Sequence, residues 1–388
     1  MIHKKTAAHS FTPFVMPHTI LLTIDVEDWF QVENFKKCIP LSAWPNCELR
    51  VEKNVHKILD LFDSIKLNNP TNSSREMRPA PWKCENYSTG SLFHWDSTNR
   101  NAATLQHSSM SDFDNSLCAM PSACPPQGFW RRAPCDSPKA KFFVLGWIAR
   151  RLPHLVREIQ ARGHEVASHG YYHKLCKEES AEGLENDLAT SKKLLEDITG
   201  APVYGYRAPG FSIDTDILIR IEEAGYFYDS SFNSFKFNKR YGQVEWFGNN
   251  GNGIIIKISD SFYELPISNL SIGGQVIPWG GGGYFRLFPL MLFKQGVQSI
   301  LKKQGVYLFY LHPWEIDPEQ PPVKDVPFTY RMRHYLNMKS TYSKLSAFIE
   351  KFKDYKFQTC HQYLLNHHKA KEANLLRQIQ KGRGEAAS

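Results

Sequence analysis

Short apolar runs alternate with segments of helical periodicity along much of the chain. Residues 20–24 (ILLTI) form a continuous β-rich run of the kind that makes buried parallel strands. Residues 51–65 then carry apolar side chains at the spacing of an amphipathic helix. Two further strands are predicted at 141–145 and 164–168, separated by a second amphipathic helix over 147–162.

The same alternation continues toward the C-terminus. A helix is predicted over 181–198 and is ended by Gly200. Further strand or helix signals follow at 203–206, 217–224, 254–258 and 306–311. Strands that alternate with helices indicate a mainly parallel sheet, and this many repeats favour a barrel or a distorted barrel. Chemistry is then expected at the C-terminal ends of the strands.

Residues 66–138 interrupt this pattern. The segment is rich in Asn, Ser and Pro and has little periodicity, although a connection at this point needs only a few residues. We interpret it as a disordered insertion at the surface, because long loops add little closure entropy. Its histidines and cysteines match no known zinc-ligand spacing.

Composition and charge narrow the class of protein. A hydrophobic fraction of 42% is enough for a substantial core, and the net charge of +8 is spread along the chain. No nucleic-acid-binding signature accompanies the basic residues, so no nucleic acid partner is expected. No apolar run is long enough to span a bilayer and no secretory signal is convincing, which predicts a soluble protein on the cytoplasmic side.

Candidate metal ligands follow two of the predicted strands. His169 and His173 are four residues apart, a spacing that can place both imidazoles on one turn of helix and toward one cation. Asp25, Glu27 and Asp28 lie at the end of the first strand, where a carboxylate could complete a site of two histidines and one carboxylate. Such a site leaves positions open for water and substrate.

Three more polar residues stand at strand ends. Arg207 begins an Arg-Ala-Pro-Gly sequence, which could hold it in a bidentate pair with a catalytic carboxylate or could be a plain turn. Asp229 could orient an imidazole, with a helix N-cap as the competing interpretation. His312 follows the strand at 308–311 and could serve as a general acid.

Taken in this order, the motifs resemble the polysaccharide deacetylases of carbohydrate esterase family 4, which share the chitooligosaccharide-deacetylase homology domain. The segments that carry the resemblance are TIDVEDWFQVENF, FFVLGWIARR, GHEVASHGYYH, YRAPGFSI, YDSSFN and LFYLHPWEID. The chain looks closest to the subgroup found with exosortase-linked exopolysaccharide gene clusters, to which YELP and GGGGYF in the C-terminal part are also similar.

The resemblance implies a fold and a domain organisation. The fold is α/β, a distorted (β/α) barrel of the polysaccharide deacetylase type. The catalytic domain is expected at 18–65 and 139–321, including the subgroup-specific C-terminal part, with the insertion at 66–138. Residues 322–388 are expected to form a helical, basic C-terminal extension.

The resemblance also implies a role for each motif residue. Asp25 matches the general base, Arg207 the arginine that positions it, and His312 the general acid. Asp229 matches the residue that supports the catalytic imidazole, and the metal-binding pair is His169 and His173.

Two positions depart from the pattern of the family. Its opening motif usually has two adjacent aspartates, of which the second binds metal, whereas here Val26 intervenes. The third metal ligand is therefore Glu27 or Asp28: alternation along a strand favours Glu27, and a tight turn could bring in Asp28. Lys141 stands where the second strand often has Thr, directly beside the insertion, and raises the question whether the fold is intact there.

The implied function is a metal-dependent hydrolase that removes N-acetyl groups from amino sugars of an exopolysaccharide or its lipid-linked precursor. Its cofactor would be a divalent metal, with zinc as the expected ion, and its partner an N-acetylated polysaccharide or oligosaccharide. Peripheral association with a polysaccharide synthesis complex at the membrane is a further expectation. Two alternatives stay open: a hydrolase of another C–N amide bond, of the deformylase or ureide hydrolase type, and an inactive glycan-binding member of such a complex.

Overall fold

The computed structural model describes residues 18–68, 134–235, 241, 244 and 254–385. Most of the predicted insertion, residues 69–133, lies outside the described residues. The strands are β1 (Thr19–Val26), β2 (Ala140–Val144), β3 (Glu165–Ser168), β4 (Gly205–Tyr206), β5 (Tyr228–Asp229), β6 (Ile256–Lys257), β7 (Tyr263–Glu264), β8 (Asn269–Ile272), β9 (Gln275–Pro278), β10 (Val306–Leu311) and β11 (Lys356–Phe357).

One curled sheet dominates the fold. Its strand order is β10-β1-β2-β3-β4-β5-β7-β6, and β11 pairs with the free part of β1. Every pairing in this sheet is parallel except β6 with β7. Strands β8 and β9 form a separate antiparallel hairpin. The predicted α/β class with a distorted barrel is confirmed, in the form of a half-barrel.

Strand β1 lies between β10 and β2 and positions the polar cluster at its end. All eight of its residues are buried, as expected for a strand with neighbours on both edges and both faces covered. Ile24 is level with Leu311 on β10 and with Phe142 on β2. Because these strands are parallel, the residues that follow β1, β2, β3 and β10 meet at one edge of the sheet.

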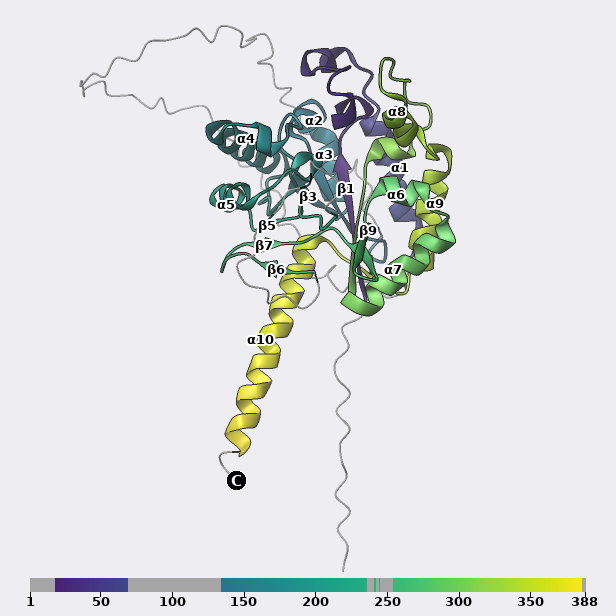
Figure 1. Cartoon of the computed structure of the whole chain (residues 1–388). Coiled ribbons are helices and arrows are strands. Elements are labelled where there is room, and N and C mark those ends of the chain that lie inside the picture. Colours follow the sequence, from purple (N-terminus) through teal and green to yellow (C-terminus); the bar gives the residue numbers. More distant parts are fainter. Residues whose placement is uncertain (1–17, 69–133, 236–240, 242–243, 245–253, 386–388) are drawn as a thin grey trace, which may run out of the picture. The chain divides into compact units, whose positions relative to one another are not determined.

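Helices cover the outside of the sheet. They are α1 (Val51–Ser64), α2 (Gly146–Arg151), α3 (Pro153–Ala161), α4 (Ala181–Thr199), α5 (Thr215–Glu223), α6 (Gly282–Leu287), α7 (Leu290–Gln304), α8 (Phe328–Tyr335), α9 (Met338–Lys351) and α10 (Cys360–Glu385). In Figure 1, α4 and α5 lie to the left of the strands and α7 and α9 to the right.

The helix predicted over 147–162 is in fact two helices. The chain leaves the helical conformation at Leu152, and Pro153 begins α3. Proline has no N–H to donate and clashes with the preceding turn, so it is tolerated at the first position of a helix but not inside one. The predicted end of α4 is confirmed, because Gly200 adopts a left-handed conformation with φ of 62°.

The sequence analysis placed a domain boundary at 321, and the packing has no break there. Strand β11 adds to β1 at Thr19 and Ile20, and Phe348 of α9 is fully buried in the main apolar cluster. The Phe348 ring lies 5.8 Å from that of Phe309 on β10 and 6.1 Å from that of Phe285 on α6. Residues on both sides of the expected boundary therefore build one core.

Lys141 is accommodated inside the sheet. Its side chain is fully buried, and Nζ donates a hydrogen bond of 2.8 Å to Oε1 of Glu165 on β3. Burial lowers the pKa of Lys141, and the Glu165 carboxylate opposes that shift. The Tyr228 hydroxyl donates to the same carboxylate oxygen at 2.8 Å. The buried charge is thus paired and hydrogen-bonded, so this departure from the family pattern leaves strands β2 and β3 in register.

The two ends of the predicted insertion meet on the body of the protein. The backbone N–H of Leu67 donates to the carbonyl of Asp136 at 2.9 Å, and that of Asn68 to the carbonyl of Lys353 at 3.0 Å. Leu67 and Ser137 are both buried. The segment between them therefore leaves and re-enters the fold at one place.

Replacing residues 69–133 by a linker of a few Gly and Ser residues should leave the fold intact. Because the ends already touch, we expect an unfolding temperature equal to or above that of the full chain, with a gain of about 2 kcal/mol at most from the shorter loop. Calorimetry of both proteins is the measurement. Loss of a cooperative transition in the shortened chain would show instead that the segment helps to hold the half-barrel.

Candidate active site

Three buried side chains form a cluster with the donor set of a metal site. One ligand atom each from Glu27, His169 and His173 can be chosen so that all three lie within 4.8 Å of one another. Nε2 of His173 is 2.9 Å from Oε2 of Glu27, yet this buried oxygen has no hydrogen-bond partner. A buried carboxylate oxygen without a hydrogen bond is costly, and a cation between these atoms would satisfy it.

The second nitrogen of His169 fixes the orientation of its ring. Nδ1 lies 2.7 Å from the backbone carbonyl of Arg207, which can only accept a hydrogen bond, so Nδ1 carries the proton and Nε2 has the free lone pair. Burial, followed by the charge of His173, lowers the pKa of His169 to about 3. The imidazole is therefore neutral, the form that binds metal.

The loop that carries the two histidines is not the turn of helix that the sequence analysis expected. Residues 169–175 contain no helix, and His173 has a positive φ of 54°. Gly170 also has a positive φ, of 72°, and the Asp187 carboxylate on α4 accepts the N–H of Tyr171 at 3.0 and 3.1 Å. A left-handed conformation is strained for a histidine, and such strain is typical of sites where a side chain must be aimed.

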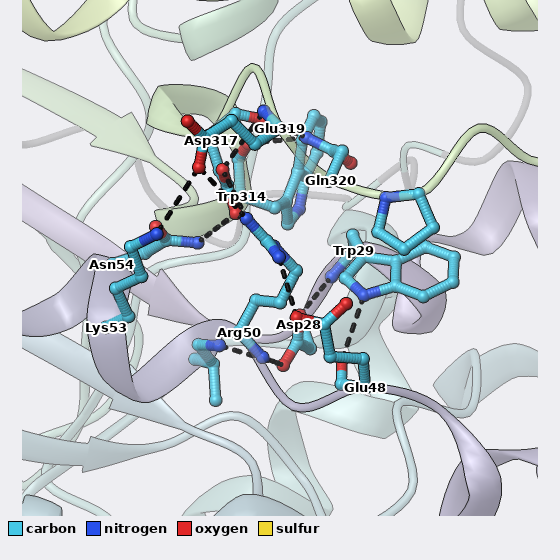
Figure 2. A network of polar contacts seen from close by, with 12 residues as sticks. Asp28, Trp29, Glu48, Arg50, Lys53, Asn54, Trp314, Asp317, Glu319 and Gln320 are labelled. Atoms are coloured by element: carbon cyan, nitrogen blue, oxygen red, sulfur yellow. Dashed lines mark hydrogen bonds and ion pairs between the residues drawn. The ribbon is translucent and has the colours of Figure 1, made fainter.

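The structure separates the two candidates for the third ligand. Asp28 points away from the histidines: its Oδ2 accepts the backbone N–H groups of Arg50 and Val51 at 2.7 and 2.8 Å, and its Oδ1 that of Trp29 at 2.8 Å. Figure 2 shows this carboxylate beside Arg50, whose guanidinium pairs with Asp317 at 2.6 Å. Asp28 thus ties the end of β1 to the start of α1, and Glu27 is left for the cluster.

Asp25 is held by a fully buried arginine. Nη1 of Arg207 is 2.6 Å from Oδ1 of Asp25 and 2.7 Å from the hydroxyl of Thr23. Nε and Nη2 of Arg207 donate to the carbonyl and the hydroxyl of Ser230 at 2.8 and 2.9 Å. The other oxygen of Asp25 stays free of the guanidinium and faces His312, 3.9 Å from its Nε2.

His312 lies beside the cluster of Glu27, His169 and His173. Its Nε2 is 3.1 Å from Oε1 of Glu27, and its Nδ1 is 2.8 Å from Oε1 of Glu315. Burial lowers the pKa of His312, but the nearby carboxylates of Glu27 and Glu315 outweigh burial and raise the pKa to about 9. The imidazole can therefore hold a proton at neutral pH and present it beside Asp25 and Glu27.

Asp229 makes different contacts from those expected. Its carboxylate accepts the N–H and the hydroxyl of Ser231 at 2.9 and 2.8 Å and is hydrogen-bonded to Glu264, and burial raises its pKa. Among the described residues it has no contact with His312, whose partner is Glu315. The sequence analysis missed Glu315, although a Glu three residues after His312, within the turn that Pro313 begins, has the spacing of a capping box.

Two neighbouring carboxylates allow a direct test of this geometry. Glu27→Gln should weaken zinc binding by more than about 100-fold, because loss of even an outer contact to a ligand typically costs 10–100-fold. Asp28→Asn should leave zinc affinity within about threefold but reduce the free energy of unfolding by about 1–2 kcal/mol, as the loss of a helix cap does. Calorimetric zinc titration and urea unfolding of the metal-free proteins measure both effects. The reverse pattern would assign the ligand to Asp28.

Comparisons with known proteins find similarity in part of the sequence and in the fold. Residues 137–228 match the family model of the polysaccharide deacetylases, and residues 230–365 match a domain of unknown function (DUF3473). A provisionally named polysaccharide deacetylase from Mycobacterium smegmatis, solved as a crystal structure, has a TM-score of 0.50 over 95% of this chain and 96% of its own, at 16% sequence identity. This likeness concerns the fold.

Two curated relatives match over part of the chain. A peptidoglycan-N-acetylglucosamine deacetylase from Bacillus cereus is 35% identical over 88 residues, which is 23% of this chain and 41% of the relative. A chitooligosaccharide deacetylase from Azorhizobium caulinodans is 31% identical over 87 residues, 22% of this chain and 41% of the relative. The chain thus spans less than half the length of either relative. Together with the family model, these matches show that part of the chain, including residues 137–228, is similar in sequence to polysaccharide deacetylases.

Proposed function

We propose that this protein is a metal-dependent hydrolase that removes N-acetyl groups from amino sugars of a glycan. The observation that carries the proposal is the buried group of Glu27, His169 and His173, with Asp25 and His312 beside it at one edge of the sheet. The group offers two types of metal ligand, imidazole and carboxylate. Beside it lie a carboxylate held by an arginine and an imidazole that can hold a proton. Amide hydrolysis needs such a set.

The three clustered side chains fit a zinc ion. Two imidazole nitrogens and one carboxylate are a common ligand set of catalytic zinc and leave a position for water. The neutral His169 and the unpartnered oxygen of Glu27 support this assignment. When bound, the cation would polarise the acetamide carbonyl and lower the pKa of a water molecule toward neutrality.

The remaining side chains divide the proton transfers between them. Asp25, with one oxygen paired to Arg207, has its second oxygen free to take a proton from the attacking water. His312 can give its proton to the leaving nitrogen, because its Nδ1 is bonded to the Glu315 carboxylate and its Nε2 faces the centre. A positioned acid or base of this kind typically contributes 10²–10⁴-fold to the rate.

The substrate class is supported by the relatives and by the sequence motifs. Both curated relatives carry names of deacetylases of N-acetylated glycans, peptidoglycan and chitooligosaccharides. The resemblance to the exosortase-linked subgroup favours an exopolysaccharide or its lipid-linked precursor, handled on the cytoplasmic side. No helix in the described residues is long and apolar enough to cross a membrane.

One alternative function would use the same residues, and the other would not need their chemistry. The same set of acid, base and metal ligands could hydrolyse another C–N amide, such as a formamide or a ureide. A catalytically inactive glycan-binding protein would have no need of Asp25, His169 and His312 within one cluster. The intact constellation therefore favours an enzyme.

Acetate release from N-acetylglucosamine oligomers tests the proposal. We expect release that requires zinc, stops with a chelator, and falls by about 10³-fold or more in His169→Ala, because that change removes a ligand of the metal that drives the reaction. His154→Ala is the matched control, since His154 is half-exposed and bonded to Glu52. Bound zinc without acetate release would redirect the search to other amides, and absence of both would contradict the proposal.

Replacement of the proton donor should separate catalysis from metal binding. His312→Asn should reduce kcat by about 10²–10⁴-fold, because the amide cannot donate a proton as an acid does. Its zinc affinity should fall by no more than about 10–100-fold, the cost of an outer contact to a ligand, because His312 contacts Glu27 but lies outside the proposed ligand set. Steady-state kinetics and zinc titration are the measurements. An unchanged kcat would assign the acid to another residue.

A further inference from the structure

The ring of His312 is fixed by a single carboxylate oxygen. Oε1 of Glu315 accepts from Nδ1 of His312 at 2.8 Å and from the backbone N–H of the same residue at 3.1 Å. The two residues are joined by η8 (Pro313–Ile316), whose first turn brings the carboxylate back over the histidine. Because the carboxylate occupies Nδ1, the nitrogen that faces Glu27 and Asp25 is Nε2.

The second oxygen of Glu315 is held by a buried arginine. Nε of Arg286 on α6 lies 2.7 Å from Oε2 of Glu315, and only 2% of Arg286 is exposed. The remaining guanidinium nitrogens donate to the backbone carbonyls at the end of α8 and just after it: those of Arg333, His334 and Leu336, at 3.3, 2.7 and 2.8 Å. Each of the three guanidinium nitrogens is thus hydrogen-bonded, and Glu315 is held in position.

Close packing also restricts the position of the Glu315 carboxylate. A Cβ atom on Gly282 would collide with the Glu315 carboxylate, so any larger residue at this position would displace the carboxylate. The imidazole of His312 stacks on Trp314 with ring centroids 5.1 Å apart, and Trp314 stacks on His334 at 4.3 Å. Rotation of the His312 ring is therefore blocked on its face as well as at Nδ1.

Asp229 serves another part of the centre. Its neighbours are Ser231 and Glu264, and the adjacent Ser230 holds Arg207 through its carbonyl and its hydroxyl. The hydroxyl of Ser231 also accepts the N–H of Ala208, next to Arg207. The carboxylate of Asp229 thus supports the segment that positions Arg207 and Asp25, on the other side of the centre from Nδ1 of His312.

We propose that Glu315, held by Arg286, is the positioning residue for His312, in the role that the family resemblance implied for Asp229. The catalytic part of this proposal rests on the proposed deacetylase function. Glu315, Arg286 and His312 all lie within 230–365, the region that matches the domain of unknown function. That region would then supply the proton donor and its support, whereas the metal-binding histidines come from the preceding deacetylase region.

Proton NMR of the metal-free protein labelled with ¹⁵N-histidine tests the contact without any assay of activity. We expect a downfield Nδ1–H signal that disappears in His312→Asn, which assigns it. It should move strongly upfield or be lost by exchange in Glu315→Gln and persist in Asp229→Asn. Persistence in Glu315→Gln, or loss in Asp229→Asn alone, would overturn the proposal.

Kinetics with N-acetylglucosamine oligomers test the consequence. Glu315→Gln should lower kcat by 10- to 100-fold while KM and zinc affinity change by less than threefold. Glu319→Gln is the matched control, because its side chain is 71% exposed and it should behave as wild type. Arg286→Lys, which keeps the charge, should retain more activity than Arg286→Gln.

The two experiments fail in different ways. If the wild-type protein releases no acetate, the proposed function is wrong, and the NMR signal still decides whether Glu315 positions His312. If acetate is released and Glu315→Gln matches Glu319→Gln in kcat, Glu315 has no part in catalysis. A variant that does not unfold cooperatively is replaced by Glu315→Asp, which keeps the charge but shortens the reach to Nδ1 and should also lower kcat.

Discussion

The buried guanidinium of Arg207 is the contact on which the centre depends. A fully buried charge is tolerated only when it is paired and hydrogen-bonded, and Arg207 meets this requirement with groups from several strands. It binds Thr23 and Asp25 on β1 and Ser230 after β5, lies 4.1 Å from the ring of Phe143 on β2, and offers its carbonyl to His169 after β3. Truncation of this side chain would leave Asp25 unpaired and loosen four strand ends at once.

The centre is assembled from parts of the chain that are far apart in sequence. Glu27 comes from the end of the first strand, the histidine pair from the loop after β3, and His312 from the end of β10. Since β1 lies between β2 and β10, all of these side chains project from one edge of the sheet. Arg286 links η8 to the end of α8 and holds Glu315. The C-terminal region therefore contacts the imidazole of His312 through Glu315. One half-barrel therefore carries a site built by two sequence regions.

Much of the framework could be predicted from the sequence, and the limits have physical causes. Apolar runs identified β1, β2 and β10, because buried parallel strands leave such runs, and β3 was also predicted at 164–168. Strands of two residues, such as β5 and β7, leave no periodic signal. Strand alternation favoured Glu27 over Asp28, but the choice needed the capping contacts of Asp28 at the start of α1. The contact of Glu315 with His312 has a local signal in the capping-box spacing, but the fixation of Glu315 by Arg286 depends on tertiary packing that no local pattern reveals.

X-ray absorption spectroscopy at the zinc edge, on the protein loaded with one equivalent of zinc, tests the central claim most directly. The account predicts a first shell of nitrogen and oxygen alone at about 2.0–2.1 Å, with the outer-shell scattering of two imidazoles, and loss of the bound zinc in Glu27→Gln. A sulfur scatterer at about 2.3 Å would place the metal on cysteines, and the same spectrum in Glu27→Gln would remove Glu27 from the site. Either result would contradict the assignment of Glu27, His169 and His173 as the metal ligands.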